Sequence, residues 1–135
     1  MANWNVEHEL GVTFDSSAGF TLPTGAMLSP DASWIAQARW DDLGAGDRRG
    51  FARICPDFVA ELRSPPDRLT DTMRKLEHWL EAGARLAWLI ALATESVYIF
   101  EPGQPVRPVV GFGQVLDARD VLPGFGLELA RLRPR

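Results

Sequence analysis

The chain has 135 residues, 46% of them hydrophobic and 24% charged, which is the composition of one ordinary globular domain. No apolar run approaches the roughly 20 residues of a membrane-spanning helix. A net charge of −4 argues against a generic nucleic-acid-binding protein, because such proteins usually have a basic surface. With Cys55 as its one cysteine, the chain cannot form an internal disulfide. We therefore expect a single domain over residues 1–135, located in the cytoplasm and without membrane contact.

The N-terminal third of the chain predicts short strands. Residues 11–14 and 19–23 have the pattern of two strands joined by the turn-forming residues 15–18. Residues 30–35 predict another strand, which begins at a proline. Residues 41–50 are rich in glycine and charge and predict a loop.

Residues 57–62 predict a buried central strand. Phe58, Val59 and Ala60 are apolar on both faces, as expected where a sheet is covered on both sides. The alternation of side chains along a strand places Val59, Glu61 and Arg63 on the same face.

A helix is predicted to follow this strand, from about residue 70 to residue 82. Thr70 and Asp67 are its candidate N-caps, and Gly83 is its expected end. An apolar stripe recurs at helical spacing along it, formed by Leu69, Met73, Leu76 and Leu80. On the helical wheel Lys75 lies beside this stripe, on the side of Thr72 and Trp79.

The C-terminal part of the chain returns to strands. Residues 86–90, 97–100 and 114–117 predict three of them, and residues 125–132 a short helix or packed tail. Strands, one main helix and further strands predict an α+β (α/β) fold in which the helix covers a mixed central sheet.

Lys75 is exceptional in this composition, because the other thirteen of the fourteen basic residues are arginine. Lysine is a compact point charge whose pKa shifts readily, which suits contact with a phosphoryl oxygen, whereas arginine is a permanently charged fork. Lys75 is therefore either a residue with a chemical role or half of an exposed pair with Asp71, four positions earlier on the helix. Nine of the fourteen basic residues fall between positions 39 and 85, which allows a local basic surface.

Asp31 and Glu61 are the candidate metal ligands. Carboxylate oxygens from two neighbouring strands suit Mg²⁺ or Mn²⁺, which take one or two protein carboxylates and leave other positions to water and substrate phosphate. A carboxylate on a buried strand needs a partner, because burying an unpaired charge is costly. For Glu61 that partner is either a metal ion or a salt bridge to Arg63, Arg74 or Lys75.

Other chemistries find less support in the sequence. The two histidines lie in no ligand-like cluster, which disfavours zinc, and no nucleophile elbow or phosphate-binding glycine loop is present. Cys55 has no spacing typical of a catalytic thiol, and we expect it in or near the core.

Several segments together resemble the Uma2 family of restriction endonuclease-like proteins, in the PD-(D/E)XK nuclease superfamily. They are residues 29–35 (SPDASWI), residues 55–65 (CPDFVAELRSP), Lys75, Trp79, residues 81–83 (EAG) and residues 87–90 (AWLI). The resemblance runs from about Gly11 to Leu132. It implies a restriction-endonuclease-like mixed sheet with flanking helices and a magnesium-dependent phosphodiesterase site.

Carried over residue by residue, the resemblance makes Asp31 and Glu61 the metal ligands and Lys75 a migrated form of the motif lysine. Arg63 stands where an unmigrated lysine would lie, and it is expected with Arg74 to contact the substrate. The implied function is that of a Mg²⁺- or Mn²⁺-dependent endonuclease acting on nucleic acid, with DNA expected as the substrate. The alternative is a non-catalytic binding or assembly module that retains the nuclease fold.

The chain departs from the family pattern at its N-terminus. Family members usually carry an additional N-terminal segment that covers the sheet. The sequence thus has the pattern of an N-terminally truncated member, and a homo-oligomer in which a second chain supplies the missing layer is one arrangement that this allows.

Overall fold

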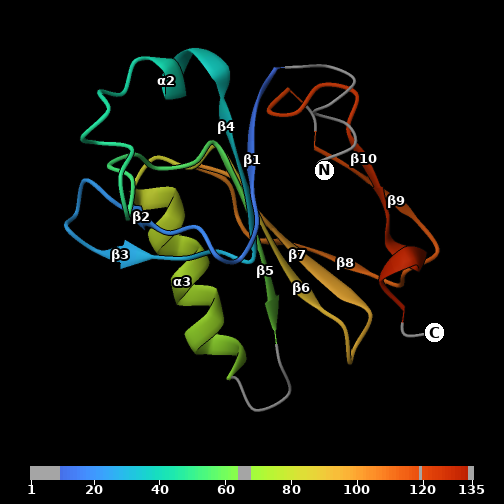
Figure 1. Cartoon of the computed structure of the whole chain (residues 1–135). Helices are drawn as coiled ribbons and strands as arrows, with labels where there is room; N and C mark the ends of the chain where they lie inside the picture. Colours follow the sequence, from blue (N-terminus) through green and yellow to red (C-terminus); the bar gives the residue numbers. More distant parts are fainter. Residues whose placement is uncertain (1–9, 64–67, 119, 134–135) are drawn as a thin grey trace.

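A mixed six-stranded sheet forms the centre of the computed structural model, which describes residues 10–63, 68–118 and 120–133 (Figure 1). The strands follow the spatial order β1 (Gly11–Phe14), β4 (Ala32–Ala36), β5 (Phe58–Arg63), β6 (Leu86–Ala91), β7 (Ser96–Phe100) and β8 (Arg107–Val110). β5 and β6 are parallel, and the other neighbouring pairs are antiparallel. The prediction of an α+β fold with a mixed central sheet is confirmed.

Two small hairpins and three helical segments complete the described part of the chain. The hairpins are β2 (Phe20–Thr21) with β3 (Met27–Leu28), and β9 (Val115–Asp117) with β10 (Gly126–Glu128). The helical segments are α2 (Gln37–Asp41), α3 (Leu69–Glu81) and the 3₁₀ turn η1 (Leu129–Leu132). In Figure 1, α3 and the β2–β3 hairpin lie on one side of the sheet, and β9, β10 and η1 lie on the other.

Each face of the sheet carries its own hydrophobic core. On β5, Phe58 faces the core formed with the C-terminal segment, whereas Val59 faces the core formed with α3. On β6, Trp88 and Leu89 alternate in the same way, and all four side chains are at most 2% exposed. The prediction of a buried strand that is apolar on both faces is confirmed, because layers cover β5 from both sides.

Helix α3 packs on the sheet through a stripe centred on Leu76 and Trp79, both fully buried. The other apolar residues of the predicted stripe are partly buried at the edge of the same core, and these are Leu69, Met73 and Leu80. The helix ends before Gly83, whose φ of +122° is a backbone conformation that glycine adopts at little cost.

The prediction of Thr70 as the N-cap of α3 is wrong. The N-cap is Arg68, in extended conformation and without a side-chain capping bond, and the alternative Asp67 lies outside the described residues.

Three other segments differ from expectation. The short helix α2 lies between the predicted strand over residues 30–35 and the predicted loop over residues 41–50, where the sequence predicted no element. Strand β8 contains Pro108, which its position at the edge of the sheet tolerates. Part of the expected C-terminal helix or tail is strand β10, followed by the single turn η1.

Among the described helices, none has the length and apolar character to cross a membrane.

Candidate functional site

Asp31 and Glu61 lie opposite each other at one end of the β4–β5 pair. The antiparallel register pairs Ala32 with Ala60, and one step further along the chains places Asp31 opposite Glu61. The backbone N–H of Asp31 donates to Oε1 of Glu61 at 3.1 Å, and the backbone N–H of Leu62 donates to Oδ2 of Asp31 at 2.6 Å. Each carboxylate is thus held by the backbone of the other strand.

Two donors from α3 meet the second oxygen of the Glu61 carboxylate. Nζ of Lys75 lies 2.8 Å from Oε2 of Glu61, and Nε1 of Trp79 donates to the same oxygen at 3.2 Å. Residues four positions apart share one face of a helix, which is why both donors reach one atom. The structure therefore brings together Asp31, Glu61 and Lys75, the three residues predicted to carry the chemistry.

The alternative partners proposed for these charges are not the ones observed. Glu61 forms its ion pair with Lys75 rather than with Arg63 or Arg74, within the residues that the structure describes. Lys75 pairs with Glu61 rather than with Asp71. Arg74 is exposed on α3, and Arg63 lies half-buried in β5, two residues beyond Glu61 and on the same face by alternation.

In the cluster of Asp31, Glu61 and Lys75, solvent reaches Asp31 and Lys75 but hardly reaches Glu61, which lies between them. The Glu61 carboxylate is buried, with 4% of its side chain exposed, whereas Lys75 is 36% exposed and Asp31 is also exposed. A buried carboxylate is costly unless it is paired and hydrogen-bonded, and here three donors serve it. A solvent-borne ligand would thus approach Glu61 through Asp31 and Lys75.

The donor set suits a hard divalent cation. An ionised carboxylate has about four lone-pair positions, and the hydrogen bonds to Glu61 use three of them, two on Oε2 and one on Oε1. On Asp31, Oδ2 accepts the Leu62 N–H, and Oδ1 is the second carboxylate oxygen that this residue could offer to an ion. Within the described ranges no group of three histidine, cysteine, aspartate or glutamate side chains could hold a metal ion.

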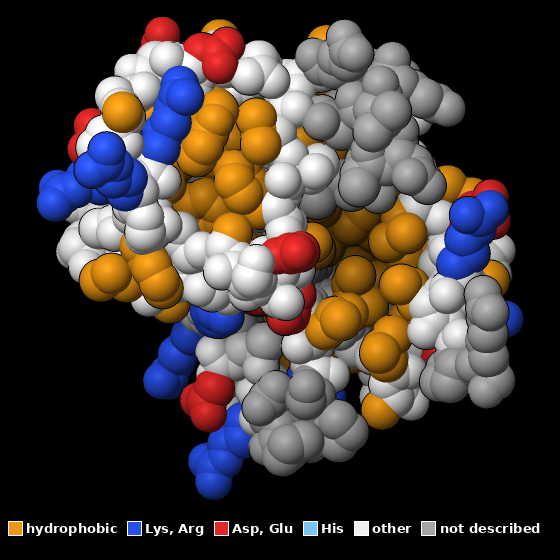
Figure 2. All heavy atoms as spheres, in the orientation of Figure 1, with side chains coloured by type: hydrophobic (Ala, Val, Ile, Leu, Met, Phe, Trp, Pro, Cys, Tyr) orange, Lys and Arg blue, Asp and Glu red, His pale blue; other side chains and the backbone are white. Residues whose placement is uncertain are grey.

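An apolar cavity of about 210 Å³ adjoins the site on the opposite face of the sheet. Figure 2 shows hydrophobic side chains around this hollow, between the sheet and the C-terminal segment. Among the described residues that line it, Asp31 is the charged one, and the others are Ala32, Phe58, Ala60, Leu62, Trp88, Ile90, Phe125 and Leu127. A polar ligand would find more partners on the α3 side of Asp31, where Glu61 and Lys75 lie.

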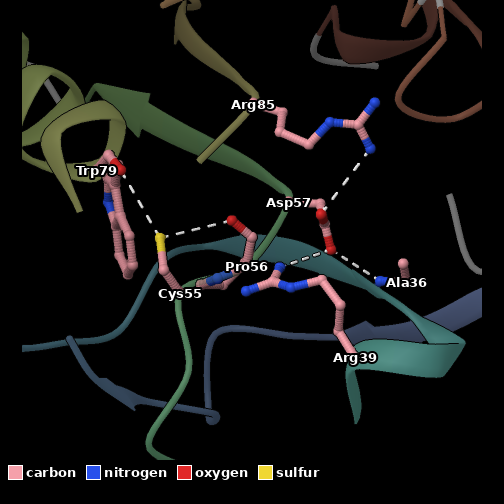
Figure 3. A network of polar contacts seen from close by, with 7 residues as sticks. All are labelled: Ala36, Arg39, Cys55, Pro56, Asp57, Trp79 and Arg85. Carbon is pink, nitrogen blue, oxygen red and sulfur yellow. Dashed lines mark hydrogen bonds and ion pairs between the residues drawn. The ribbon is translucent and has the colours of Figure 1, made fainter. Parts of the chain in front are cut away.

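A second buried carboxylate, Asp57, lies at the other end of β5 (Figure 3). Its Oδ2 accepts the backbone N–H of Ala36 at 2.8 Å and lies 2.9 Å from NH1 of Arg39. Arg85 lies 3.9 Å from its other oxygen. These contacts tie the start of β5 to the end of β4, which indicates a structural role for Asp57.

The adjacent Cys55 is buried, as predicted. Its Sγ lies 3.5 Å from the carbonyl oxygen of Pro56 and 3.7 Å from that of Trp79. Burial raises the pKa of the Cys55 thiol to about 12, so the thiol stays protonated at neutral pH. A protonated buried thiol is a poor nucleophile, which agrees with a core role.

Sequence reasoning missed the contact between Trp79 and Glu61. It placed Trp79 on the same side of the helix as Lys75, but it assigned no partner to the indole N–H. The spacing of four residues between Lys75 and Trp79 could have indicated the contact, because residues four apart on a helix face the same partner. The strand that α3 packs against could not be read from that spacing.

The fold defines an α+β protein with a mixed six-stranded sheet and a flanking helix. The chain belongs to the Uma2 family, described as "Putative restriction endonuclease", whose sequence pattern matches residues 1–130. The resemblance inferred from the sequence motifs is thereby confirmed.

One solved structure has a closely similar fold. A crystal structure of a protein from Anabaena variabilis ATCC 29413, described as a putative nuclease belonging to DUF820, superposes with a TM-score of 0.82 at 19% identity. The similarity covers 96% of this chain and 72% of that one. A cryo-electron microscopy structure of a DrdV–DNA complex gives a TM-score of 0.48 at 13% identity, over 80% of this chain and 9% of that one, which is too low for a structural inference. No curated protein matches the chain.

Proposed function

We propose that this protein is a metal-dependent endonuclease that hydrolyses phosphodiester bonds in DNA. The observation that carries the proposal is the convergence on Glu61, where Lys75 lies 2.8 Å from one carboxylate oxygen and the backbone of Asp31 lies 3.1 Å from the other. Membership of the Uma2 family supports a nuclease class for this site. The proposed site lies within a single nuclease-like domain, residues 1–135.

Asp31 and Glu61 would hold Mg²⁺ or Mn²⁺ between them. Their carboxylate oxygens, Oδ1 of Asp31 and Oε1 of Glu61, are the hard ligands that these ions prefer. When bound, the ion would supply Lewis-acid polarisation of the phosphate and a lowered pKa for an attacking water.

Lys75 would stabilise the charge that grows on the phosphoryl oxygens during hydrolysis. Its ammonium group has three donors, of which one contacts Glu61 and one lies at a longer 3.5 Å from the carbonyl oxygen of Ser29. An ammonium aimed at developing negative charge in a site of reduced polarity is an effective catalytic group.

Arg63 and Arg74 would contact the DNA backbone beside the reacting phosphate. Arg74 precedes Lys75 on the exposed side of α3, and Arg63 follows Glu61 on the same face of β5. Because arginine is always protonated, these two residues would position phosphates without exchanging protons.

A cleavage assay tests this function. The purified chain would be incubated with supercoiled, linear and single-stranded DNA, in Mg²⁺, in Mn²⁺ and in EDTA. We expect cleavage of at least one DNA form that needs the metal and is lost in Asp31→Asn, a variant that keeps an acceptor for the Leu62 N–H. Asp71→Asn, which changes an exposed carboxylate on α3, should cleave like the parent.

Two outcomes would contradict the proposal. Equal cleavage by the parent and Asp31→Asn would indicate a contaminating nuclease. Absence of cleavage, together with a gel shift of the same DNA that does not depend on metal, would favour the binding module over the enzyme.

A further inference from the structure

The two α3 donors to Glu61 Oε2 differ in their freedom to move. Trp79 is 0% exposed, and its ring packs against Phe20 with a centroid separation of 6.4 Å. Its indole N–H cannot leave Glu61 unless the core opens. Lys75 is 36% exposed at the end of a flexible stem, so its ammonium group can leave Oε2 and remain in water.

The two donors also differ in how a nearby cation would affect them. A divalent ion at the carboxylate pair would repel the ammonium of Lys75, because like charges at such short range interact strongly in a partly buried site. The neutral indole N–H of Trp79 would feel no such repulsion. It would also keep Oε2 hydrogen-bonded after Lys75 leaves, which avoids the cost of an unsatisfied buried acceptor.

We propose that Trp79 is the fixed partner and Lys75 the exchangeable partner of Glu61. Trp79 is then a positioning residue that holds Oε2 so that Oε1 stays directed toward Asp31. Lys75 occupies the carboxylate in the metal-free site and moves to the substrate phosphate when a divalent cation binds. This inference rests on the proposed metal site and adds to it an order of events and a role for Trp79.

The chain offers a matched control for Trp79. Trp88 is 1% exposed, and its Nε1 is buried without a hydrogen-bond partner among the described residues. Trp79→Phe and Trp88→Phe therefore each remove one indole ring from a core, but only Trp79→Phe removes a hydrogen bond to Glu61. The difference between the two variants isolates that bond from the effect of lost packing.

The chain also offers a single reporter for the exchange, since Lys75 is its only lysine. Protein labelled with ¹³C and ¹⁵N in lysine gives one Cε–Nζ set of side-chain NMR signals, and the Nζ signal can be followed while MgCl₂ is added. We expect that signal to shift and saturate with the same apparent Kd as the backbone amides of Asp31 and Leu62.

We expect Trp79→Phe to weaken Mg²⁺ binding by roughly ten-fold, as loss of a group that orients a metal ligand typically does. Trp88→Phe should bind within about two-fold of the parent, because no bond to the ligand is lost.

A metal-free measurement covers the case in which Trp79→Phe fails to fold. Without metal, the NMR signal of the Trp79 indole proton should shift between the parent and Glu61→Gln, because the variant removes the carboxylate charge. The signal of the Trp88 indole proton should stay in place. An unmoved Trp79 signal would overturn the positioning role whether or not metal binds.

The remaining outcomes separate this inference from the proposed function. A lysine signal that stays in place while the Asp31 and Leu62 amides saturate would overturn the exchange and leave the metal site intact. Equal Mg²⁺ affinities of Trp79→Phe and Trp88→Phe would overturn the positioning role alone. Absence of Mg²⁺ binding by the parent would overturn both the exchange and the metal site.

Discussion

Replacing Lys75 by methionine should lower the rate of DNA cleavage by roughly 10²–10³-fold, the usual cost of removing one donor that stabilises transition-state charge. Methionine keeps an apolar stem of similar length but has no ammonium group. Binding of Mn²⁺ should persist or tighten, because a positive charge 2.8 Å from Oε2 of Glu61 is removed. Loss of rate with retained ion binding would assign Lys75 to the chemical step rather than to the assembly of the site.

The measurement is single-turnover cleavage at saturating metal, with Mn²⁺ affinity determined on the same samples. Arg131→Met is the matched control, since Arg131 is an exposed cation paired with Glu128 in the C-terminal segment. Cleavage by Lys75→Met at the parent rate would remove Lys75 from the mechanism.

Replacing Asp57 by alanine should lower the free energy of unfolding by about 2–4 kcal/mol, the range for breaking a buried hydrogen-bonded ion pair at one partner. The change leaves the N–H of Ala36 without its acceptor and removes the 2.9 Å contact to Arg39. We place the effect below the upper end seen for buried pairs, because Arg39 is 42% exposed and can return to water. Such a loss is a large part of the roughly 5–15 kcal/mol that stabilises a typical domain.

Urea denaturation followed by tryptophan fluorescence measures this effect. Asp57→Asn should cost less, because its amide oxygen still accepts the Ala36 N–H. Glu77→Ala, at an exposed position of α3, should stay within about 0.5 kcal/mol of the parent. Folded Asp57→Ala should still bind Mn²⁺, since Asp57 lies before β5 at the end remote from Glu61. A stability equal to that of the parent would show that the Asp57 contacts contribute little.

The central layer of the fold was predictable from local pattern. Phe58, Val59 and Ala60 are apolar in succession, which few structures other than a doubly covered strand explain. The following helix was equally clear from the recurrence of Leu69, Met73 and Leu76, and from Gly83 at its end. These apolar patterns can be recognised from neighbouring residues along the chain alone, and they are strong because both the strand and the helix bury apolar side chains.

The parts that were not predictable depend on tertiary contacts. Helix α2 has no side-chain cap and no buried residue, so nothing in its sequence separates it from the loop that follows. Strand β8 contains Pro108, and only its edge position makes that residue acceptable. Sequence left three cations open as partners of Glu61, because the choice depends on the rotation of α3 against β5. That same rotation brings Trp79 to the carboxylate.

Calorimetric titration of Mn²⁺ into the purified chain measures whether Asp31 and Glu61 hold a divalent ion between them. Asp31→Asn is the informative variant, because it removes one ligand charge and keeps the hydrogen bond from Leu62. Asp71→Asn is the control for loss of an exposed carboxylate. We predict saturable binding of Mn²⁺ by the parent and by Asp71→Asn, and loss of that binding in Asp31→Asn. Absence of binding by the parent, or equal binding by Asp31→Asn, would contradict the two-carboxylate metal site.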